Sequence, residues 1–469
     1  MHRIFSKNNL FWCLIALIAV GSRFFLLGER SFWYDEALSF EIAKAPVWQI
    51  MGKTSWSGDE NPPLYFLLLH FWLYFGKSEC VIRLLSLLFG LLSFPLLYAT
   101  AKTIFNREVA RISLLLFAFS WLHIRYSQEA RPYSLFVFFS LASVYFLFLA
   151  LRENRFRDWG FYILFAVLNL FTHIFSLLLI FSQLIFLLLI SKKKGKNIFF
   201  LVVGGFLLSF FIPPLQEQYL HLLERHTFLL ADFSWVSPIR FLSSMLAGFS
   251  SGHPSLPLGF FSIPLVCILL GKMLVAFRRE RSFQLLFLLT QFGLPLLGAA
   301  LASFFVPDLF IRYMVFLLPI FLILVSRGIS LLPSRSLKMG AIIILLLLNS
   351  IQLFHYYRDI KGNPHTWKKL CAWIETKLKP GEIVAVFPEH HRLSLQYYLK
   401  KEVSIKPIPS CDSVEFAALM GEASLKNIWF VYSFRPHPRD AEEKIYQWVQ
   451  QRAEKTGFPE LFFLPPAKN

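Results

Sequence analysis

The chain has 469 residues, of which 56% are hydrophobic and only 16% are charged, with a formal net charge of +18. The 54 phenylalanines and a mean hydropathy of +0.54 exclude an ordinary soluble enzyme. Apolar runs of about 15 to 20 residues recur between Leu10 and Phe354, which predicts a polytopic membrane protein. Lys and Arg gather in short clusters between these runs, so the positive charge indicates membrane topology and no nucleic-acid binding.

The basic clusters predict how the chain crosses the membrane, because Lys and Arg concentrate in cytoplasmic loops. We expect a multi-pass protein of the cell (inner or plasma) membrane with a cytoplasmic N-terminus and a retained first helix that runs outward. Alternating crossings then give about 11 spans and place the C-terminus outside the membrane. The spans are predicted at residues 10–27, 81–101, 112–126, 132–151, 198–212, 256–277, 283–305, 313–332 and 339–354, with two more within 159–191.

Two stretches are predicted to be outer loops of unusual length. The first, about residues 28–80, contains amphipathic material over Ala37–Met51 and a short apolar segment over Pro62–Phe75. We interpret the apolar segment as an interfacial helix, because the next basic cluster permits only one inward crossing before it. A further outer loop is expected at residues 213–256.

The composition changes near residue 356, where polar residues reach ordinary density. We therefore divide the chain into a transmembrane domain over residues 1–355 and an extracytoplasmic domain over 356–469. Strands are predicted at 382–387, 403–408, 427–432 and 460–464, and helices at 366–378, 393–400, 414–420 and 440–454. This alternation is typical of a small α/β domain. No chemistry is assigned to it, and a disulfide between Cys371 and Cys411 stays open.

The predicted topology gathers ionisable side chains at the outer face. Carboxylates at span ends are often merely solvated, but unpaired charge between two apolar spans is expensive. Neighbouring like charges can also raise a carboxyl pKa and make a base usable near neutral pH. The outer-face candidates are Asp35, Glu36, Glu60, Glu129, Arg131, His173 and Arg312.

Several motifs around these residues resemble one family. The sequence is similar to the dolichyl-phosphate-mannose protein mannosyltransferase-like family of integral membrane glycosyltransferases (family 39 type), which is related to the lipid A aminoarabinose transferase. The resemblance is strong over about residues 10–200, weaker to about 355, and absent from the C-terminal domain. It is carried by Phe32–Ala37, Glu60–His70, Arg83–Ser86, His123–Ser134 and Thr172–His173, with Arg312–Tyr313 as a later landmark.

The resemblance implies a mainly α GT-C fold and transfer of a sugar from a polyprenyl-phosphate-linked donor to a protein, lipid or polysaccharide acceptor. It implies a hexosyl or pentosyl transferase that acts at the outer face and matches the family's acidic motif at Asp35–Glu36. The sequence departs from the family at Asn61, where many relatives have Lys or His. Oligosaccharyl relatives have aspartates where Glu129 stands beside Arg131, which weakens the case for a metal site.

The expected chemistry is an inverting transfer. Asp35 is the preferred base, with Glu36 as its neighbour or alternate. Arg131 and Arg312 would stabilise the leaving phosphate. No metal ligands are assigned, although a divalent metal is left open. The remaining substrate-binding candidates are Glu60, Asn61, Tyr65, Glu129 and His173.

The alternative function is a transporter or flippase of polyprenyl-linked sugars. A transporter should carry ionisable groups at mid-span and show paired broken spans. In this sequence nearly all candidate groups lie at one face, and no such pair is found, which favours an enzyme.

Overall fold

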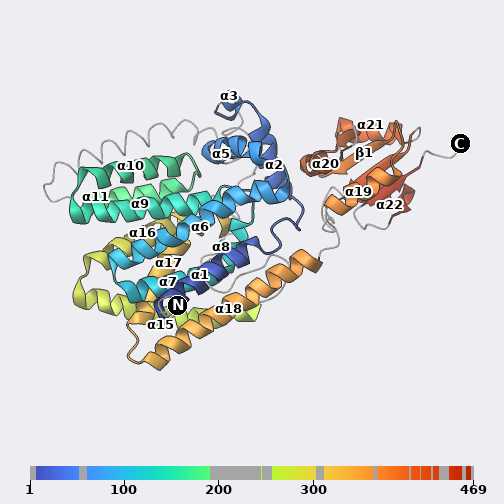
Figure 1. Cartoon of the computed structure of the whole chain (residues 1–469). Coiled ribbons are helices and arrows are strands. Elements are labelled where there is room, and N and C mark those ends of the chain that lie inside the picture. The colour runs from blue at the N-terminus through green and yellow to red at the C-terminus, as the bar shows by residue number, and fades with distance from the viewer. Residues whose placement is uncertain are drawn as a thin grey trace, which may run out of the picture. The chain divides into compact units, whose positions relative to one another are not determined.

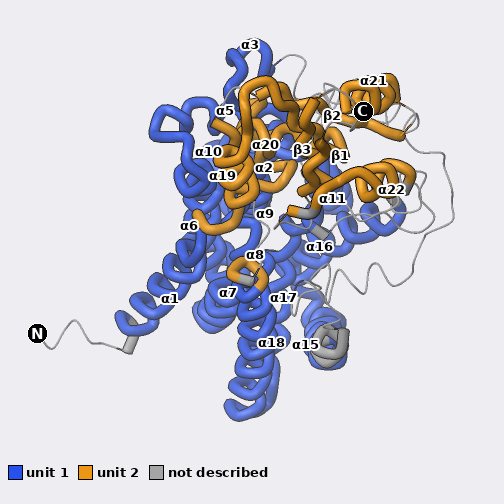
Figure 2. Tube along the Cα trace, turned by 90° about the vertical axis from the view of Figure 1, so that its right-hand side faces the viewer, with its two compact units in different colours: residues 1–27, 43–358 blue, residues 28–42, 359–469 orange. Residues whose placement is uncertain are grey.

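The computed structural model describes residues 7–51, 61–190, 245, 256–302, 311–362, 367–400, 403–411, 413–423, 426–432, 443–456 and 461–465. It falls into two compact units, one of residues 1–27 with 43–358 and one of residues 28–42 with 359–469 (Figure 2). The second unit thus joins a segment near the N-terminus to the C-terminal domain. The sequence had assigned residues 28–42 to the first outer loop and gave no sign of this association.

The first unit is a bundle of apolar helices (Figure 1). Helix α9 packs against both α6 and α10, and α17 packs against α7 and α15. The helices are α1 (Lys7–Phe24), α3 (Val47–Gln49), α5 (Leu64–Trp72), α6 (Glu79–Ile104), α7 (Arg107–Phe119), α8 (Trp121–Ser127), α9 (Tyr133–Glu153), α10 (Phe156–Leu170), α11 (Ser176–Ile190), α15 (Leu256–Glu280), α16 (Phe283–Ala302), α17 (Leu318–Ser330) and α18 (Arg335–Gly362), with 3₁₀ turns η2 (Leu73–Phe75) and η4 (Ile311–Leu317).

Five helical stretches among the described residues are long and apolar enough to cross a membrane, and a sixth is possible if a bent pair forms one span. The chain is therefore a multi-pass membrane protein. Each span predicted within the described residues coincides with an apolar helix. The predicted span at 198–212 and the loop at 213–256 lie outside the described residues, so the total of about 11 spans stays a prediction.

The segment 112–126, predicted as one span, is broken at Ser120 into two helices. Helix α7 ends before Ser120, and α8 then leaves at an angle of 60°. Ser120 has extended backbone angles, and its hydroxyl oxygen accepts a hydrogen bond from the backbone N–H of His123 at 3.5 Å. A serine that caps a new helix competes with continuation of the old one. The bend changes the direction in which the chain continues after α8.

Glycine permits close packing between α15 and α17. A Cβ atom on Gly328 would lie 2.6 Å from the backbone oxygen of Leu269, and a backbone atom cannot move aside as a side chain can. We expect Gly328→Ala to cost about 1–3 kcal/mol through overpacking, seen as a lower midpoint of thermal unfolding in detergent. Gly340→Ala is the matched control, because no atom of the described residues lies within 4 Å of its added Cβ. Equal unfolding midpoints for the two variants would contradict the expectation.

The second unit contains a mixed sheet (Figure 1). Its five strands have the order β2-β1-β3-β5-β4. Strand β1 pairs in parallel with β2 and β3, with Ala385 opposite both Lys406 and Phe430. Strand β5 runs antiparallel to β3 and β4. The strands are β1 (Ile383–Phe387), β2 (Ser404–Pro407), β3 (Ile428–Tyr432), β4 (Glu454–Lys455) and β5 (Leu461–Leu464).

Helices cover both faces of this sheet, which explains why β1 and β3 are continuously apolar. Val384 and Val386 share a core with Leu395 of α20, whereas Ala385 shares the opposite core with Leu419 of α21. The helices are α19 (Trp367–Lys377), α20 (Arg392–Tyr398), α21 (Val414–Glu422) and α22 (Glu443–Arg452), with the 3₁₀ turn η5 (Glu389–His391) before α20.

The predicted α/β class of the C-terminal domain is confirmed, with all four predicted strands and all four predicted helices present. Strand β4 was missed, because the helix predicted to end at residue 454 ends at Arg452. Its two residues form a strand only by pairing with β5. Cys371 and Cys411 are free thiols in this structure.

Candidate functional site

The acidic motif forms the first turn of α2 (Tyr34–Lys44). The backbone N–H groups of Glu36 and Ala37 both donate to the backbone oxygen of Trp33 at 3.1 Å, which closes this turn. Both carboxylates therefore lie at the positive end of the helix dipole, where negative charge is stabilised. Stabilisation of the helix is by itself a sufficient reason for two acids in this turn. A chemical role for either acid must therefore be argued from the different surroundings of the two side chains.

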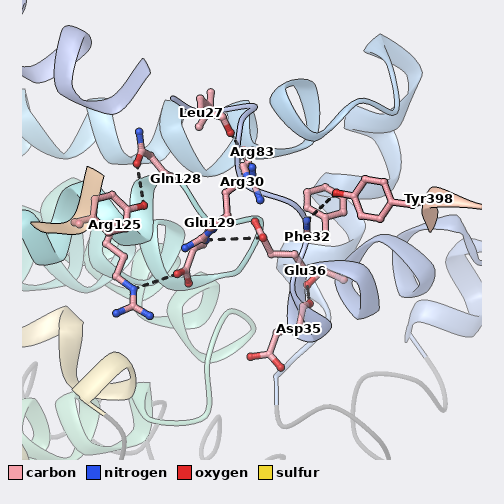
Figure 3. A network of polar contacts seen from close by, with 12 residues as sticks. Leu27, Arg30, Phe32, Asp35, Glu36, Arg83, Arg125, Gln128, Glu129 and Tyr398 are labelled. Carbon is pink, nitrogen blue, oxygen red and sulfur yellow. Dashed lines mark hydrogen bonds and ion pairs between the residues drawn. The ribbon is translucent and has the colours of Figure 1, made fainter. Parts of the chain in front are cut away.

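The two carboxylates have different surroundings. Glu36 is fully buried, and its Oε2 lies 3.9 Å from Nη2 of Arg30, with which it forms an ion pair (Figure 3). The neighbouring Asp35 is only partly buried. A buried carboxylate paired with a cation serves structure, since removing one partner leaves an uncompensated charge. A base must reach its substrate, so the geometry favours Asp35 for that role.

The segment after α8 carries Glu129 and Arg131, and both side chains are buried. Arg125 Nε donates to Glu129 Oε1 at 3.3 Å (Figure 3), so Arg125 is a partner of Glu129. The backbone N–H of Arg131 donates to the backbone oxygen of Glu129 at 2.8 Å, which makes a tight turn. Ser86 of α6 fixes this turn from behind by donating its hydroxyl to the backbone oxygen of Arg131 at 3.1 Å.

Gln128 anchors the same segment to the end of α1. Its Nε2 donates to the backbone oxygens of Arg23 and Phe25 at 2.9 and 2.8 Å. Its Oε1 accepts the hydroxyl hydrogen of Tyr356 in α18 at 2.9 Å. Gln128 thus connects three elements from distant parts of the sequence, and holds the backbone next to Glu129 in one place.

His173 lies in the turn between α10 and α11, among aromatic rings. It stacks on Phe136 with ring centroids 4.6 Å apart, and the rings of Tyr133 and Tyr313 lie 5.9 and 5.5 Å away. Burial, and after it the positive charges of Arg131 and Arg312, lower the pKa of His173 to about 3. The histidine is therefore neutral, and two guanidinium groups lie close enough to act on it.

The tautomer of His173 follows from its backbone contact. Its Nδ1 accepts the backbone N–H of Phe175 at 3.2 Å, so the single proton of the neutral ring resides on Nε2. This buried Nε2–H has no hydrogen-bond partner in the part of the chain that the structure describes. The same holds for the buried hydroxyl groups of Tyr133 and Ser176. A buried donor without an acceptor lowers the stability of the fold unless a ligand accepts its hydrogen bond.

Arg312 and the start of α5 complete this cluster. Arg312 Nη2 donates to the hydroxyl oxygen of Tyr313 at 3.3 Å, and its guanidinium lies 5.1 Å from the centroid of that ring. The backbone N–H of Leu64 donates to the backbone oxygen of Phe171 at 2.9 Å, which joins the start of α5 to the end of α10, and Asn61 just before α5 is buried.

Tyr65 supports the cluster from behind. Its ring is fully buried, and its hydroxyl lies 2.9 Å from the hydroxyl of Ser86, which fixes the Arg131 turn. This arrangement favours a supporting role over stacking on a sugar.

The first unit therefore brings together most of the residues proposed from the sequence. We call Arg131, His173 and Arg312 the basic cluster; Asn61, Tyr65 and Glu129 lie on the elements that surround it. Asp35 and Glu36 belong to the second unit. Glu60 lies outside the described residues.

The basic cluster is unsuited to a cation. Arg131 and Arg312 contribute positive charge, and the Nε2 of neutral His173 carries a proton, so it cannot coordinate a cation. Across the described segments, no three side chains of His, Cys, Asp or Glu are placed to hold a metal ion. Hydrogen-bond donors and guanidinium groups instead suit a phosphate oxygen.

Three residues with apparent roles at these sites were missed from the sequence. Arg30 compensates Glu36, Ser86 fixes the Arg131 turn, and Tyr133 adds a hydroxyl beside His173. A basic residue shortly before the acidic pair was the available signal for Arg30. Ser86 and Tyr133 lie in the motifs Arg83–Ser86 and His123–Ser134 that carry the family resemblance, but the role of each depends on a contact with another element.

The chain is similar to known proteins in one segment of its sequence and in its fold. Residues 60–216 match the family model described as dolichyl-phosphate-mannose-protein mannosyltransferase, and this segment contains Arg131 and His173. No curated protein matches the chain. Similar solved structures include ArnT from Cupriavidus metallidurans, in the apo state and bound to undecaprenyl phosphate; each has a TM-score of 0.63 at 13% identity and covers 98% of both chains.

The fold is also similar to that of the archaeal oligosaccharyltransferase AglB from Archaeoglobus fulgidus, in complex with an inhibitory peptide and a dolichol-phosphate. That match has a TM-score of 0.53 at 11% identity and covers 91% of this chain and 70% of AglB. The predicted resemblance and the predicted GT-C fold are thereby confirmed.

Proposed function

We propose that this multi-pass membrane protein, a GT-C glycosyltransferase by its fold and its mannosyltransferase-type segment, transfers a sugar from a polyprenyl-phosphate-linked donor to an acceptor at the outer face of the membrane, with inversion at the sugar. The observation that carries the proposal is the basic cluster, in which two guanidinium groups act on His173 and the buried Nε2–H of His173 has no hydrogen-bond partner among the described residues. The undecaprenyl phosphate bound to ArnT and the dolichol-phosphate bound to AglB support a lipid phosphate as the ligand.

The basic cluster would bind the phosphate of the donor and stabilise it as a leaving group. When the bond between the sugar C1 and the phosphate oxygen breaks, the electron pair stays on the phosphate and its negative charge rises. Arg131 and Arg312 would stabilise this charge electrostatically, and His173 would donate a hydrogen bond to it. A neutral histidine donor does not lose its proton to the phosphate, so it holds the ligand without competing as an acid.

The carboxylate of Asp35 would serve as the general base. As the acceptor atom bonds to C1 from the face opposite the phosphate, its proton passes to Asp35. Charge is balanced, because the acceptor loses a proton and the lipid phosphate takes up the electron pair. Glu36 keeps its ion pair with Arg30 throughout and fixes the helix that carries Asp35.

The test uses purified protein in lipid vesicles, the polyprenyl-phosphate-sugar fraction of native membranes as donor, and mass spectrometry of envelope glycans and glycolipids with and without the gene. We expect one glycan modification to disappear with the gene and to be restored by the protein. Intact glycans together with movement of the donor between leaflets would support a flippase and reject the transferase.

His173 provides a prediction on pH. His173→Phe removes the Nε2–H donor and is expected to weaken binding of undecaprenyl phosphate about 10-fold or more, because a hydrogen bond to a charged group is worth about 1.5–3 kcal/mol. The pKa of His173, lowered to about 3, keeps the ring neutral above pH 5. The ratio of the two dissociation constants should therefore stay constant from pH 5 to 8, measured by calorimetry.

A histidine with its ordinary pKa of about 6.5 would behave differently. It would gain a positive charge as the pH falls through 6.5, and the wild type would then gain affinity over the variant. If the dissociation constant of the variant divided by that of the wild type rises on acidification, the assignment of His173 as a neutral donor is wrong. Protonation of the phosphate itself affects both proteins equally, so it cancels in the ratio.

A further inference from the structure

Residues 28–42 are bound to the C-terminal domain by two hydrogen bonds. The backbone N–H of Phe32 donates to the hydroxyl oxygen of Tyr398 at 2.8 Å (Figure 3). The hydroxyl oxygen of Ser31 accepts the backbone N–H of Lys368 at 3.1 Å. Lys368 lies in the first turn of α19, where backbone N–H groups have no partner within their own helix. Ser31 therefore caps a helix of the C-terminal domain from a segment near the other end of the chain.

Aromatic rings strengthen the same contact on both sides of the acidic pair. Before it, the buried ring of Phe32 packs on Tyr397 at 4.7 Å between centroids. After it, the buried ring of Phe40 meets Tyr397 edge-on at 5.0 Å. Such pairs contribute about 0.5–1.5 kcal/mol beyond their burial. The acidic turn is thus held at both ends by one tyrosine.

The turn η5 of the C-terminal domain reaches the acidic pair itself. The ring of Tyr34 lies 5.0 Å from that of His390 in an edge-to-face arrangement. Burial lowers the pKa of His390, while the negative charges of Glu389 and Asp35 act in the opposite direction. The effect of Asp35 indicates that its carboxylate lies near this histidine.

Helix α2 needs such support. It has 11 residues, and an isolated helix shorter than about 12–15 residues is marginal in water. The C-terminal domain supplies a rigid support, because α20 is itself anchored to the sheet through fully buried Leu395. The contacts of Ser31, Phe32 and Phe40 with this domain therefore stabilise the segment that carries the start of α2.

We propose that the C-terminal α/β domain holds the carboxylate helix in its catalytic position, with Tyr397 and Tyr398 as positioning residues. The inference rests on the proposed function only in giving Asp35 a catalytic role. A domain with no motif of its own thereby becomes part of the transfer machinery. The transferase should work poorly when this contact is weakened, even though neither tyrosine touches the reacting atoms.

The test compares full-length Tyr397→Ala and Tyr398→Phe with the wild type. Tyr398→Phe removes only the hydroxyl that accepts the Phe32 N–H, and Tyr397→Ala removes the ring against Phe32 and Phe40. Tyr446→Phe is the matched control, since Tyr446 packs on Tyr432 within the same domain. Two readouts are used: hydrogen–deuterium exchange of residues 31–42, and kcat and apparent KM with the membrane donor fraction.

We expect faster exchange over residues 31–42 in both variants and a kcat lowered about 10-fold or more by Tyr397→Ala, because small displacements of a catalytic group are costly. The apparent KM for the donor and the exchange of the sheet should stay as in the wild type. Unchanged exchange in residues 31–42, or an equal loss in Tyr446→Phe, would overturn the proposal.

The two proposals fail in different ways. A wild-type protein that orders residues 31–42 but transfers no sugar would reject the proposed function and leave the contact intact. A wild-type protein that transfers sugar while Tyr397→Ala and Tyr398→Phe retain its kcat would reject the positioning role alone.

Discussion

Asp35→Asn is expected to lower the rate of sugar transfer by about 10²- to 10⁴-fold, the range that a general base contributes. The amide keeps the size of the carboxylate but cannot accept the acceptor's proton. Asp35 is partly exposed and lies in the first turn of α2, so the substitution should leave insertion and folding intact. The measurement is kcat in vesicles with the membrane donor fraction.

Two further variants serve as the control and the comparison for Asp35→Asn. Glu415→Gln is the matched control, because Glu415 is also an exposed carboxylate in the first turn of a helix, α21, and should keep full activity. Glu36→Gln should instead reduce the yield of folded protein, because it removes the partner of Arg30. Full activity of Asp35→Asn together with a well-folded, inactive Glu36→Gln would transfer the role of base to Glu36.

Arg131→Gln is expected to lower kcat/KM by about 10²- to 10³-fold, comparable to the loss of one oxyanion-stabilising group. Arg131 is buried and fixed by Ser86 and by the turn at Glu129, so its guanidinium cannot easily be replaced by a neighbour. The loss should appear in kcat as well as in KM, because the charge on the phosphate grows as the bond to the sugar breaks.

The identity of the cation can be tested at the same position. Arg131→Lys restores the charge but not the two-pronged geometry, so it should recover only part of the activity. Arg335→Gln removes an exposed arginine at the start of α18 and should have no effect. Wild-type kcat/KM in Arg131→Gln would eliminate Arg131 from the phosphate site.

The residues proposed to bind the phosphate belong to the helical unit. The proposed base belongs to residues 28–42, which fold with the C-terminal domain. A truncated chain without residues 359–469 would therefore lose the platform for α2, although every catalytic candidate would still be present. Experiments on this protein should keep the chain whole.

The sequence by itself determined the membrane-spanning character, the α/β class of the C-terminal domain and the residue types of the site. These are local properties: long apolar runs match the thickness of a bilayer, and short continuous apolar runs match strands buried on both faces. Asp35, Arg131 and His173 were recognisable because charged or polar residues are rare between apolar helices. The residues of the basic cluster could be named from the sequence, but the contacts among them could not be predicted.

Only the tertiary structure decided which of these residues meet and what state they are in. The neutral tautomer of His173 depends on the backbone of Phe175 and on burial, and the distinction between Asp35 and Glu36 depends on Arg30. The contact of Phe32 with Tyr397 and Tyr398 joins segments far apart in the chain. A sequence pattern over a short stretch indicates whether each residue faces water, lipid or the protein interior. Contacts between distant elements depend on how those elements pack, and no local pattern contains that information.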